Sequence, residues 1–282
     1  MQLYTLNAED WRMDGGAGFG LVPKTIWSKS YPADELNYIP MKSRCLLVKT
    51  EDRIVLIDTG MGRKRDEKYY GYKYIFGEDS LEKGFKDLGI AFSDVTDIIL
   101  THLHDDHVGG CVTLNKTTSE YSLVFPNAKH WISKGQWDWA MNPNRREAGT
   151  YFKDNFVPLH DAGKVVFVEN EAEHIPGIFF KMVSGHTKDM IIPLVNFHGK
   201  TLAYMADFIP STAHIPIPYI AAVDIVPLLS LEEKEAFLKE AAEKNIFMYF
   251  EHDFFTEICC VKKSEKGIVL DKVLTLNDFV NE

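Results

Sequence analysis

The residues with the clearest capacity for chemistry lie in one short segment, at positions 101–110. His102, His104, Asp106 and His107 fall within six positions, directly after a predicted buried strand. Imidazole and carboxylate groups together suit zinc or another divalent transition metal. The His-x-His alternation lets two imidazoles point the same way from an extended stretch, while Asp106 and His107 turn toward a second position. One segment can therefore supply ligands to two metal ions, and a polar surface turn is the weaker alternative.

Four other residues, in this segment or before it in the chain, have expected roles around the ligands. Gly109 and Gly110 lack a Cβ atom, which lets the backbone run close to the metals and open a helix. We expect Asp105 to face away from its neighbours, toward solvent or into a supporting contact. Asp58, in the sequence Asp58-Thr59-Gly60, is predicted to accept hydrogen bonds from the ligand segment and so fix its geometry. An ordinary turn aspartate before a glycine is equally compatible with that position.

Three further candidate ligands each follow a predicted strand later in the chain. His186, Asp207 and His252 come after apolar runs at 179–183, 201–205 and 247–250. The ends of such strands converge on one edge of a sheet, so these side chains are expected to meet the first group. For any one of them alone, a satisfied polar residue at a strand end is the more common explanation. The other histidines outside the pattern are expected to have surface or hydrogen-bonded roles: His130, His160, His174 and His198.

The elements that position these residues are predicted from periodicity and end signals. Ser80 to Leu88 has helical spacing and stops at Gly89, and Ser230 with Glu233 three residues later forms a capping-box signature for a helix to about Lys244. A hairpin closing on Asp58 and several later strands indicate two packed sheets flanked by helices. The predicted strands are at 45–49, 54–57, 97–100, 164–168, 179–183, 190–197, 201–205 and 247–250, and one more ends at 131–132. Further helices are predicted at 133–141 and 145–154.

Composition limits the classes of partner. The 282 residues carry 31 Lys and Arg against 41 Asp and Glu, a net charge of −10, so the surface offers no footprint for nucleic acid. The four cysteines include no C-x-x-C pair and favour a reducing, cytoplasmic location. The start of the chain does not read as a signal peptide, and residues 215–229 are too broken by proline for a membrane span. We expect no nucleic-acid or membrane partner.

With these residues in place, the chain resembles the metallo-β-lactamase superfamily over residues 40–255, on His102-x-His104-x-Asp106-His107 and the preceding Asp58-Thr59-Gly60. The resemblance implies an α/β (α+β) fold, a four-layer αβ/βα sandwich, as a single domain over residues 1–282. It also implies a dinuclear centre of two divalent ions, with zinc as the first choice and iron, manganese and cobalt as alternatives. The implied ligands are His102, His104 and His186 for one metal, Asp106, His107 and His252 for the other, and Asp207 bridging.

Details within the motifs resemble the hydrolytic branch. Di-iron oxygen-reducing relatives usually have a glutamate where this chain has His104, and many true β-lactamases have a cysteine where it has Asp207. Residues 207–224 resemble the group with quorum-quenching lactonases and methyl parathion hydrolase. The lactonases commonly place a tyrosine just after the bridging aspartate, whereas this chain has Pro210 three residues on, which argues against N-acyl homoserine lactones.

The resemblance implies hydrolysis of lactones or related esters by a metal-bridging hydroxide, with Asp106 and Asp207 as catalytic residues and Asp106 able to shuttle a proton. A phosphotriesterase, a glyoxalase II-like thioesterase, a di-iron redox protein and a non-catalytic metal scaffold are the alternatives. Phe208 is a candidate for the substrate pocket. His214 is either a leaving-group acid or substrate contact, or a structural histidine. The aromatic run at 69–76 lines an acyl pocket or else packs in the core or at a homodimer surface.

Overall fold

The computed structural model describes residues 1–282, and they group into two units. The first unit comprises residues 1–10 and 43–170, and the second comprises residues 11–42 and 171–282. Strands β1 (Gln2–Asp14) and β2 (Tyr38–Lys49) continue from one unit into the other. Mixed α/β content with two large sheets is as predicted, while the single domain stays a prediction. None of the helices has the length and apolar character needed to cross a membrane.

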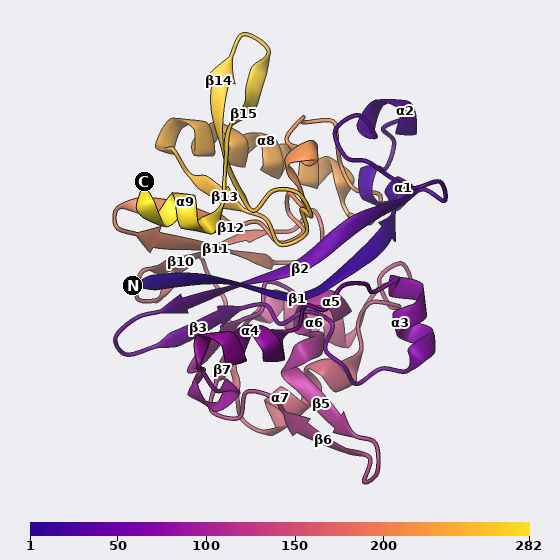
Figure 1. Ribbon diagram of the computed structural model, residues 1–282, viewed down its shortest axis with the longest axis vertical. Coiled ribbons are helices and arrows are strands. Elements are labelled where there is room, and N and C mark those ends of the chain that lie inside the picture. Colours follow the sequence, from indigo (N-terminus) through magenta and orange to yellow (C-terminus); the bar gives the residue numbers. More distant parts are fainter. The chain divides into compact units, whose positions relative to one another are not determined.

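The sheet of the first unit places the ligand segment at the ends of parallel strands (Figure 1). Its strand order is β1-β2-β3-β4-β7-β8, and β3, β4, β7 and β8 are parallel to one another. Parallel strands present their carboxyl ends at the same edge, so Asp58 after β3 and Thr101 after β4 lie beside each other. The bounds are β3 (Ile54–Ile57), β4 (Asp97–Ile99), β7 (Lys129–Ser133) and β8 (Val165–Val168).

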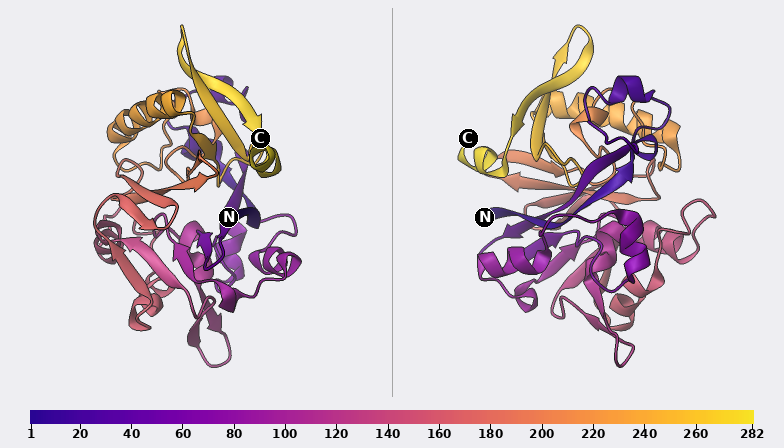
Figure 2. Two further views of the ribbon diagram at one scale, coloured as in Figure 1. Left: turned by 90° about the vertical axis from the view of Figure 1, so that its left-hand side faces the viewer. Right: turned by 45° about the vertical axis from the view of Figure 1, so that its right-hand side comes forward.

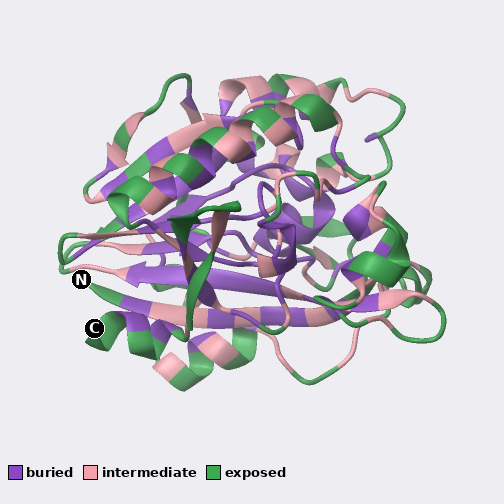
Figure 3. Ribbon diagram, turned by 90° about the horizontal axis from the view of Figure 1, so that it is seen from above, coloured by how far each residue is buried: buried purple, intermediate pink, exposed green.

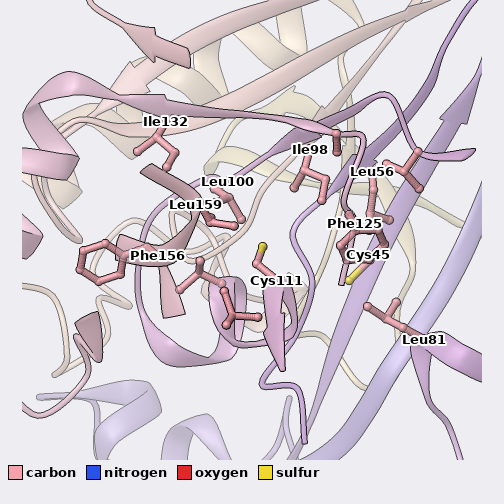
Figure 4. Close-up of a cluster of buried hydrophobic side chains, with 14 of the residues drawn as sticks. Cys45, Leu56, Leu81, Ile98, Leu100, Cys111, Phe125, Ile132, Phe156 and Leu159 are labelled. Atoms are coloured by element: carbon pink, nitrogen blue, oxygen red, sulfur yellow. The ribbon is translucent and has the colours of Figure 1, made fainter. Parts of the chain in front are cut away.

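Helices and a small hairpin connect these strands. They are α3 (Glu67–Lys73), α4 (Leu81–Leu88), α5 (Asp105–Val108), β5 (Val112–Asn115), β6 (Glu120–Leu123), α6 (Lys134–Met141) and α7 (Val157–Asp161). The predicted helix from Ser80 is confirmed in α4, because Ser80 accepts a hydrogen bond from the amide of Lys83 and Gly89 ends the helix at φ 65°. Its buried Leu81 and Phe85 join an apolar cluster that includes Leu56 and Ile98 (Figure 4).

The sheet of the second unit has the strand order β15-β14-β13-β12-β11-β10-β9. β10 and β12 are both antiparallel to β11, and β12 is parallel to β13, so β10, β12 and β13 all run in one direction. Their carboxyl ends, before His186, Asp207 and His252, therefore lie along one edge. The bounds are β9 (Ala172–Ile175), β10 (Ile178–Val183), β11 (Met190–Phe197), β12 (Lys200–Tyr204), β13 (Phe247–Tyr249), β14 (Ile258–Ser264) and β15 (Gly267–Leu274).

The helices of the second unit are α1 (Gly15–Phe19), α2 (Lys24–Trp27), α8 (Pro227–Lys244) and α9 (Leu276–Asn281). The long α8 is the crossover between the parallel strands β12 and β13, and the β14–β15 hairpin reaches out beyond the body of the unit (Figure 2). Buried residues dominate several strands, such as β2, β4 and β11, whereas α8 has both buried and exposed positions, and Figure 3 shows both kinds of element. That pattern is expected when a sheet is covered by amphipathic helices.

Two helix predictions were wrong. The helix around Ser230 begins at Pro227, because proline at the first helical position needs no amide partner, and Ser230 therefore lies inside α8. Glu233 instead accepts hydrogen bonds from the amides of Ser184 and Gly185, at 2.8 and 3.0 Å. Residues 145–154 contain only turns and the start of a 3₁₀ turn, because their polar groups bond locally, as when Asn144 accepts from the amide of Glu147 at 3.1 Å.

Candidate metal centre

His102 and His104 lie on the loop after β4, and their rings face each other. His102 Nε2 and His104 Nδ1 are 3.0 Å apart, and both side chains are buried. Two nitrogens bound to one tetrahedral zinc ion, at about 2.0 to 2.1 Å from it, would be about 3.3 Å apart. The two nitrogens are therefore spaced as neighbouring ligands of one cation.

Asp106 and His107 follow in the short helix α5, and Asp58 holds this part of the segment. His107 Nδ1 donates to Asp58 Oδ2 at 3.0 Å, so in the neutral ring Nε2 carries no proton. His107 Nε2 lies 3.8 Å from Asp106 Oδ1. Asp58 also accepts from the amide and the hydroxyl of Thr101, at 2.9 and 2.7 Å. Asp58 thus accepts hydrogen bonds from Thr101 and His107 of the ligand segment, as the prediction that it fixes the geometry of this segment requires.

The glycines of the segment have a different neighbour from the one expected. A Cβ atom on Gly109 would lie 2.2 Å from the carbonyl oxygen of Met61, and one on Gly110 would lie 2.2 Å from that of Thr59. These glycines allow the close approach of the loop after β3, and that loop carries Asp58. Thr59 completes the junction, since its amide and hydroxyl both donate to the carbonyl of His107, at 2.8 and 2.9 Å.

Asp105 is buried, so the expectation that it faces solvent was wrong and the supporting contact holds instead. It is 4% exposed, accepts a hydrogen bond from Tyr69 and forms an ion pair with Lys73 at 3.0 Å. Both partners belong to α3, the helix formed by part of the aromatic run at 69–76. Tyr72 on that helix is 71% exposed, and a role of the run in substrate binding stays a prediction.

In the second unit, Asp207 faces two histidines through separate oxygens. Its Oδ2 lies 3.0 Å from His186 Nε2, and its Oδ1 lies 2.7 Å from His252 Nε2. A ligand that bridges two cations must offer one oxygen to each, and the Asp207 carboxylate has that arrangement. Burial lowers the pKa of His186, but Asp207 and Asp224 outweigh it and raise that pKa to about 10. The two carboxylates therefore favour positive charge at this imidazole, which a bound cation would also supply.

The remaining ring nitrogens of these histidines are also bound. His186 Nδ1 donates to Asp224 Oδ1 at 3.0 Å, and His252 Nδ1 donates to the carbonyl of Lys42 at 2.6 Å. In the first unit, His102 Nδ1 lies 3.1 Å from the hydroxyl of Thr101. Asp224 and the Lys42 carbonyl were missed from the sequence. No motif marks them, because they are distant in the chain from the histidines they contact.

His214 and Phe208 lie in the loop after β12 and have structural partners. His214 Nε2 donates to the carbonyl of Gly18 at 2.8 Å, its Nδ1 lies 2.7 Å from the hydroxyl of Ser211, and its ring stacks on Phe19 at 4.5 Å. Burial lowers the pKa of His214 to about 4, so the ring is neutral at pH 7. This geometry favours the structural alternative for His214. Phe208 is 6% exposed and packs edge-on against Phe237, and its contact with substrate stays a prediction.

The candidate ligands of the first unit and those of the second unit are both chemically suited to divalent metal ions. His102 with His104, Asp106 with His107, and His186 with Asp207 each offer ligand atoms within 4.8 Å of one another. Histidines that bind a metal characteristically donate their other N–H to a carboxylate, a carbonyl or a hydroxyl, and His102, His107, His186 and His252 do so here. The structure thus brings together four predicted ligands within the first unit and three within the second. The joining of the two sets at one centre belongs to the proposal below.

Comparison with known proteins agrees with this donor set. A family model for the metallo-beta-lactamase superfamily matches residues 38–250. The N-acyl homoserine lactonase AiiA of Bacillus thuringiensis subsp. kurstaki is 24% identical over 229 residues, which cover 77% of this chain and 83% of that protein.

Solved structures match over nearly the whole chain. A probable metal-dependent hydrolase from Staphylococcus aureus has a TM-score of 0.88 and 29% identity, and the match covers 97% of this chain and 96% of that one. AidC, a dizinc quorum-quenching lactonase in complex with a product, N-hexanoyl-L-homoserine, has a TM-score of 0.79 and 25% identity, with 98% and 95% coverage.

Proposed function

The chain belongs to the metallo-beta-lactamase superfamily, shares its fold and is a metal-dependent hydrolase, and we propose that its substrates are lactones or related esters. We further propose that it uses two divalent cations, with zinc as the first choice. His102, His104 and His186 would hold one cation, Asp106, His107 and His252 would hold the other, and Asp207 would be available to both.

The observation that carries the two-cation proposal is the position of the Asp207 carboxylate. Each of its oxygens faces a different histidine, His186 at 3.0 Å and His252 at 2.7 Å. A carboxylate serving one cation would have no need of a histidine nitrogen on both sides. A cysteine, common at this place in β-lactamases, could not present two separate oxygens. This supports a hydrolase of the aspartate-bridged kind.

The charge of the site supports an electron-rich substrate. Two divalent cations supply Lewis acidity, which activates water at neutral pH and polarises a carbonyl or phosphoryl oxygen. Asp106 and Asp207 are the only carboxylates among the seven proposed ligands, so they offset two of four positive charges. The remaining charge favours the developing negative charge on an ester oxygen. Asp106 has a second role in this proposal, because its carboxylate can accept or return a proton beside the reacting group.

The choice of lactones rests on the named relatives. The matching lactonases share about a quarter of their residues with this chain over most of its length. Such lactonases commonly have a tyrosine just after the bridging aspartate, whereas this chain has Pro210 three residues on, which favours a lactone or ester other than an N-acyl homoserine lactone. A cytoplasmic location is part of the proposal, and it is supported by the free thiols of all four cysteines.

The test is a substrate panel on enzyme of measured metal content. Zinc-loaded protein is assayed against aliphatic lactones, N-acyl homoserine lactones, aryl esters, phosphotriesters and thioesters. We expect the highest kcat/KM on a lactone or ester. A preference for phosphotriesters or thioesters would refute the substrate class, and oxygen consumption by an iron-loaded sample with a reductant would refute hydrolysis as the main activity.

Two variants test the site itself. Asp207→Ala and His104→Ala should each lower kcat/KM by orders of magnitude with the far-ultraviolet circular dichroism unchanged. Asp161→Ala is the matched control, because the Asp161 side chain is 72% exposed and its charged neighbour, His160 at 3.7 Å, is not a proposed ligand, so it should leave activity unchanged. Full activity in both site variants would refute the proposed ligands.

A further inference from the structure

A buried acidic residue, Glu147, lies in the turns after α6 and was not singled out by its sequence. Its side chain is 3% exposed. Its Oε2 accepts hydrogen bonds from the indole N–H of Trp139 and the side-chain amide of Asn144, both at 2.6 Å. Two neutral donors thus fix one oxygen and leave Oε1 to face elsewhere.

The second oxygen of this carboxylate lies near a proposed metal ligand. Glu147 Oε1 lies 3.5 Å from His104 Nε2, and the hydroxyl of Tyr151 lies 3.4 Å from the same oxygen. The Tyr151 ring also contacts the His104 ring, with centroids 4.8 Å apart, and its hydroxyl donates to Gln136 at 2.9 Å. A carboxylate oxygen therefore lies at the edge of the His104 imidazole, within ion-pair distance of Nε2, and a phenol ring lies beside it.

The other four candidate histidines show what this contact does. Each has its outer nitrogen bound, with Thr101, Asp58, Asp224 and the Lys42 carbonyl as partners. His104 is the one whose outer nitrogen is Nε2, because its Nδ1 faces His102. From this we infer that Glu147 is a positioning residue for His104, one that keeps the proton on Nε2 and directs Nδ1 toward the metal. The inference rests on the proposed ligand set.

The charge of Glu147 is the part that matters. A buried carboxylate is costly to keep ionised unless cations or strong donors surround it. Trp139 and Asn144 are neutral donors, and an imidazole N–H made more positive by a bound cation would add a stronger, charged one. In return the carboxylate makes Nδ1 a stronger electron donor.

Glu147→Gln separates this role from packing. The carboxamide oxygen can still accept from Trp139 and Asn144, and its NH₂ group then faces the N–H of His104. The side-chain NH₂ group and the His104 N–H would then be two donors facing each other, at the contact that the carboxylate makes in the wild type. Trp139→Phe is a second variant that keeps the carboxylate but removes one of the donors that fix it.

The same unit contains a matched control. Asp97 is 1% exposed and accepts from the indole N–H of Trp131 at 2.9 Å, as Glu147 accepts from Trp139. Its other partners are Arg53 at 2.8 Å and Thr96 at 2.7 Å, and none of these is a proposed ligand. Asp97→Asn therefore disturbs a buried carboxylate and its tryptophan without touching the ligand histidines.

The experiment measures metal affinity and coordination in the full chain. Zinc affinity is measured by competition with a chromophoric chelator, coordination by the visible spectrum of the cobalt(II)-loaded protein, and folding by thermal unfolding. We expect Glu147→Gln to weaken the affinity for the zinc ion that His104 is proposed to bind by about 10- to 100-fold, and to alter the cobalt spectrum. Trp139→Phe should shift both in the same direction by less, and Asp97→Asn should lower only the unfolding midpoint.

Wild-type affinity and spectrum in Glu147→Gln would overturn the inference, and so would an equal loss of affinity in Asp97→Asn. If Glu147→Gln does not fold, Trp139→Phe decides, and unchanged affinity there overturns it. His104→Ala distinguishes the two levels of the proposal. Retained metal and activity in His104→Ala would refute the ligand set, whereas their loss beside a normal Glu147→Gln would refute only the role of Glu147.

Discussion

Asp58→Asn is the perturbation whose outcome the geometry determines most sharply. Asp58 is fully buried and has a positive φ of 56°, a conformation that asparagine tolerates as well as aspartate does. The substitution therefore keeps size and backbone and changes one oxygen into an NH₂ group. That group must face either His107 or Thr101, since Asp58 accepts from both.

If the NH₂ group faces His107, it donates to Nδ1 and moves the ring proton to Nε2. Nε2 is the nitrogen proposed to bind metal, and a protonated nitrogen cannot be a ligand. If it faces Thr101, it opposes the Thr101 amide, which now donates to Asp58 at 2.9 Å. A buried donor without an acceptor costs about 1 to 3 kcal/mol. Loss of such a supporting contact typically costs 10- to 100-fold in metal affinity, or about 1.4 to 2.7 kcal/mol.

The assay is zinc affinity by chelator competition, together with urea unfolding of the metal-free chain. We expect weakened binding of one zinc ion and a loss of stability of at most about 3 kcal/mol, which leaves the chain folded. Asp97→Asn is the control, because it is the same substitution at a buried carboxylate that contacts no candidate ligand. Two zinc ions bound to Asp58→Asn with wild-type affinity would show that Asp58 does not set the tautomer of His107.

Three further outcomes follow from burial and packing. Burial lowers the pKa of His130 from 6.5 to about 4. Between these pH values the histidine is protonated in the unfolded chain but neutral in the folded chain, so the free energy of unfolding falls as the pH falls below about 6.5. Between pH 8 and pH 5 the wild type should lose about 2 kcal/mol more than His130→Leu in urea titrations, and equal losses would contradict this. Gly185→Ala places a Cβ atom 2.4 Å from the backbone nitrogen of Ser230 and should cost about 1 to 3 kcal/mol in thermal unfolding. Gly71→Ala, which meets nothing within 4 Å, is its control, and equal midpoints for the two would refute the clash. Removing metal from the holoenzyme with a chelator should lower the unfolding midpoint, because only the folded chain holds the complete site, and an unchanged midpoint would argue against bound metal.

Local patterns in the chain were sufficient for elements whose ends are set by their own residues. Ser80 and Gly89 bound α4 because a hydroxyl caps its first turn and a glycine takes the left-handed conformation at its end. The same reasoning failed at Ser230, where Pro227 started the helix earlier and Glu233 found its partners at residues 184 and 185. Those amides are more than forty positions away in the chain, so no local pattern could include them.

The candidate ligands were predictable because their spacing is local and their types are chemically selective. Histidine and aspartate clustered directly after a strand have few other uses, and His186, Asp207 and His252 follow strands that all point one way. Tertiary structure decided which ring nitrogen of each histidine faces the proposed metal and which groups contact the other nitrogen. Asp224, Glu147 and the Lys42 carbonyl act across distances in sequence that carry no periodicity, because a hydrogen bond depends on where folding places two atoms and not on how far apart they are in the chain.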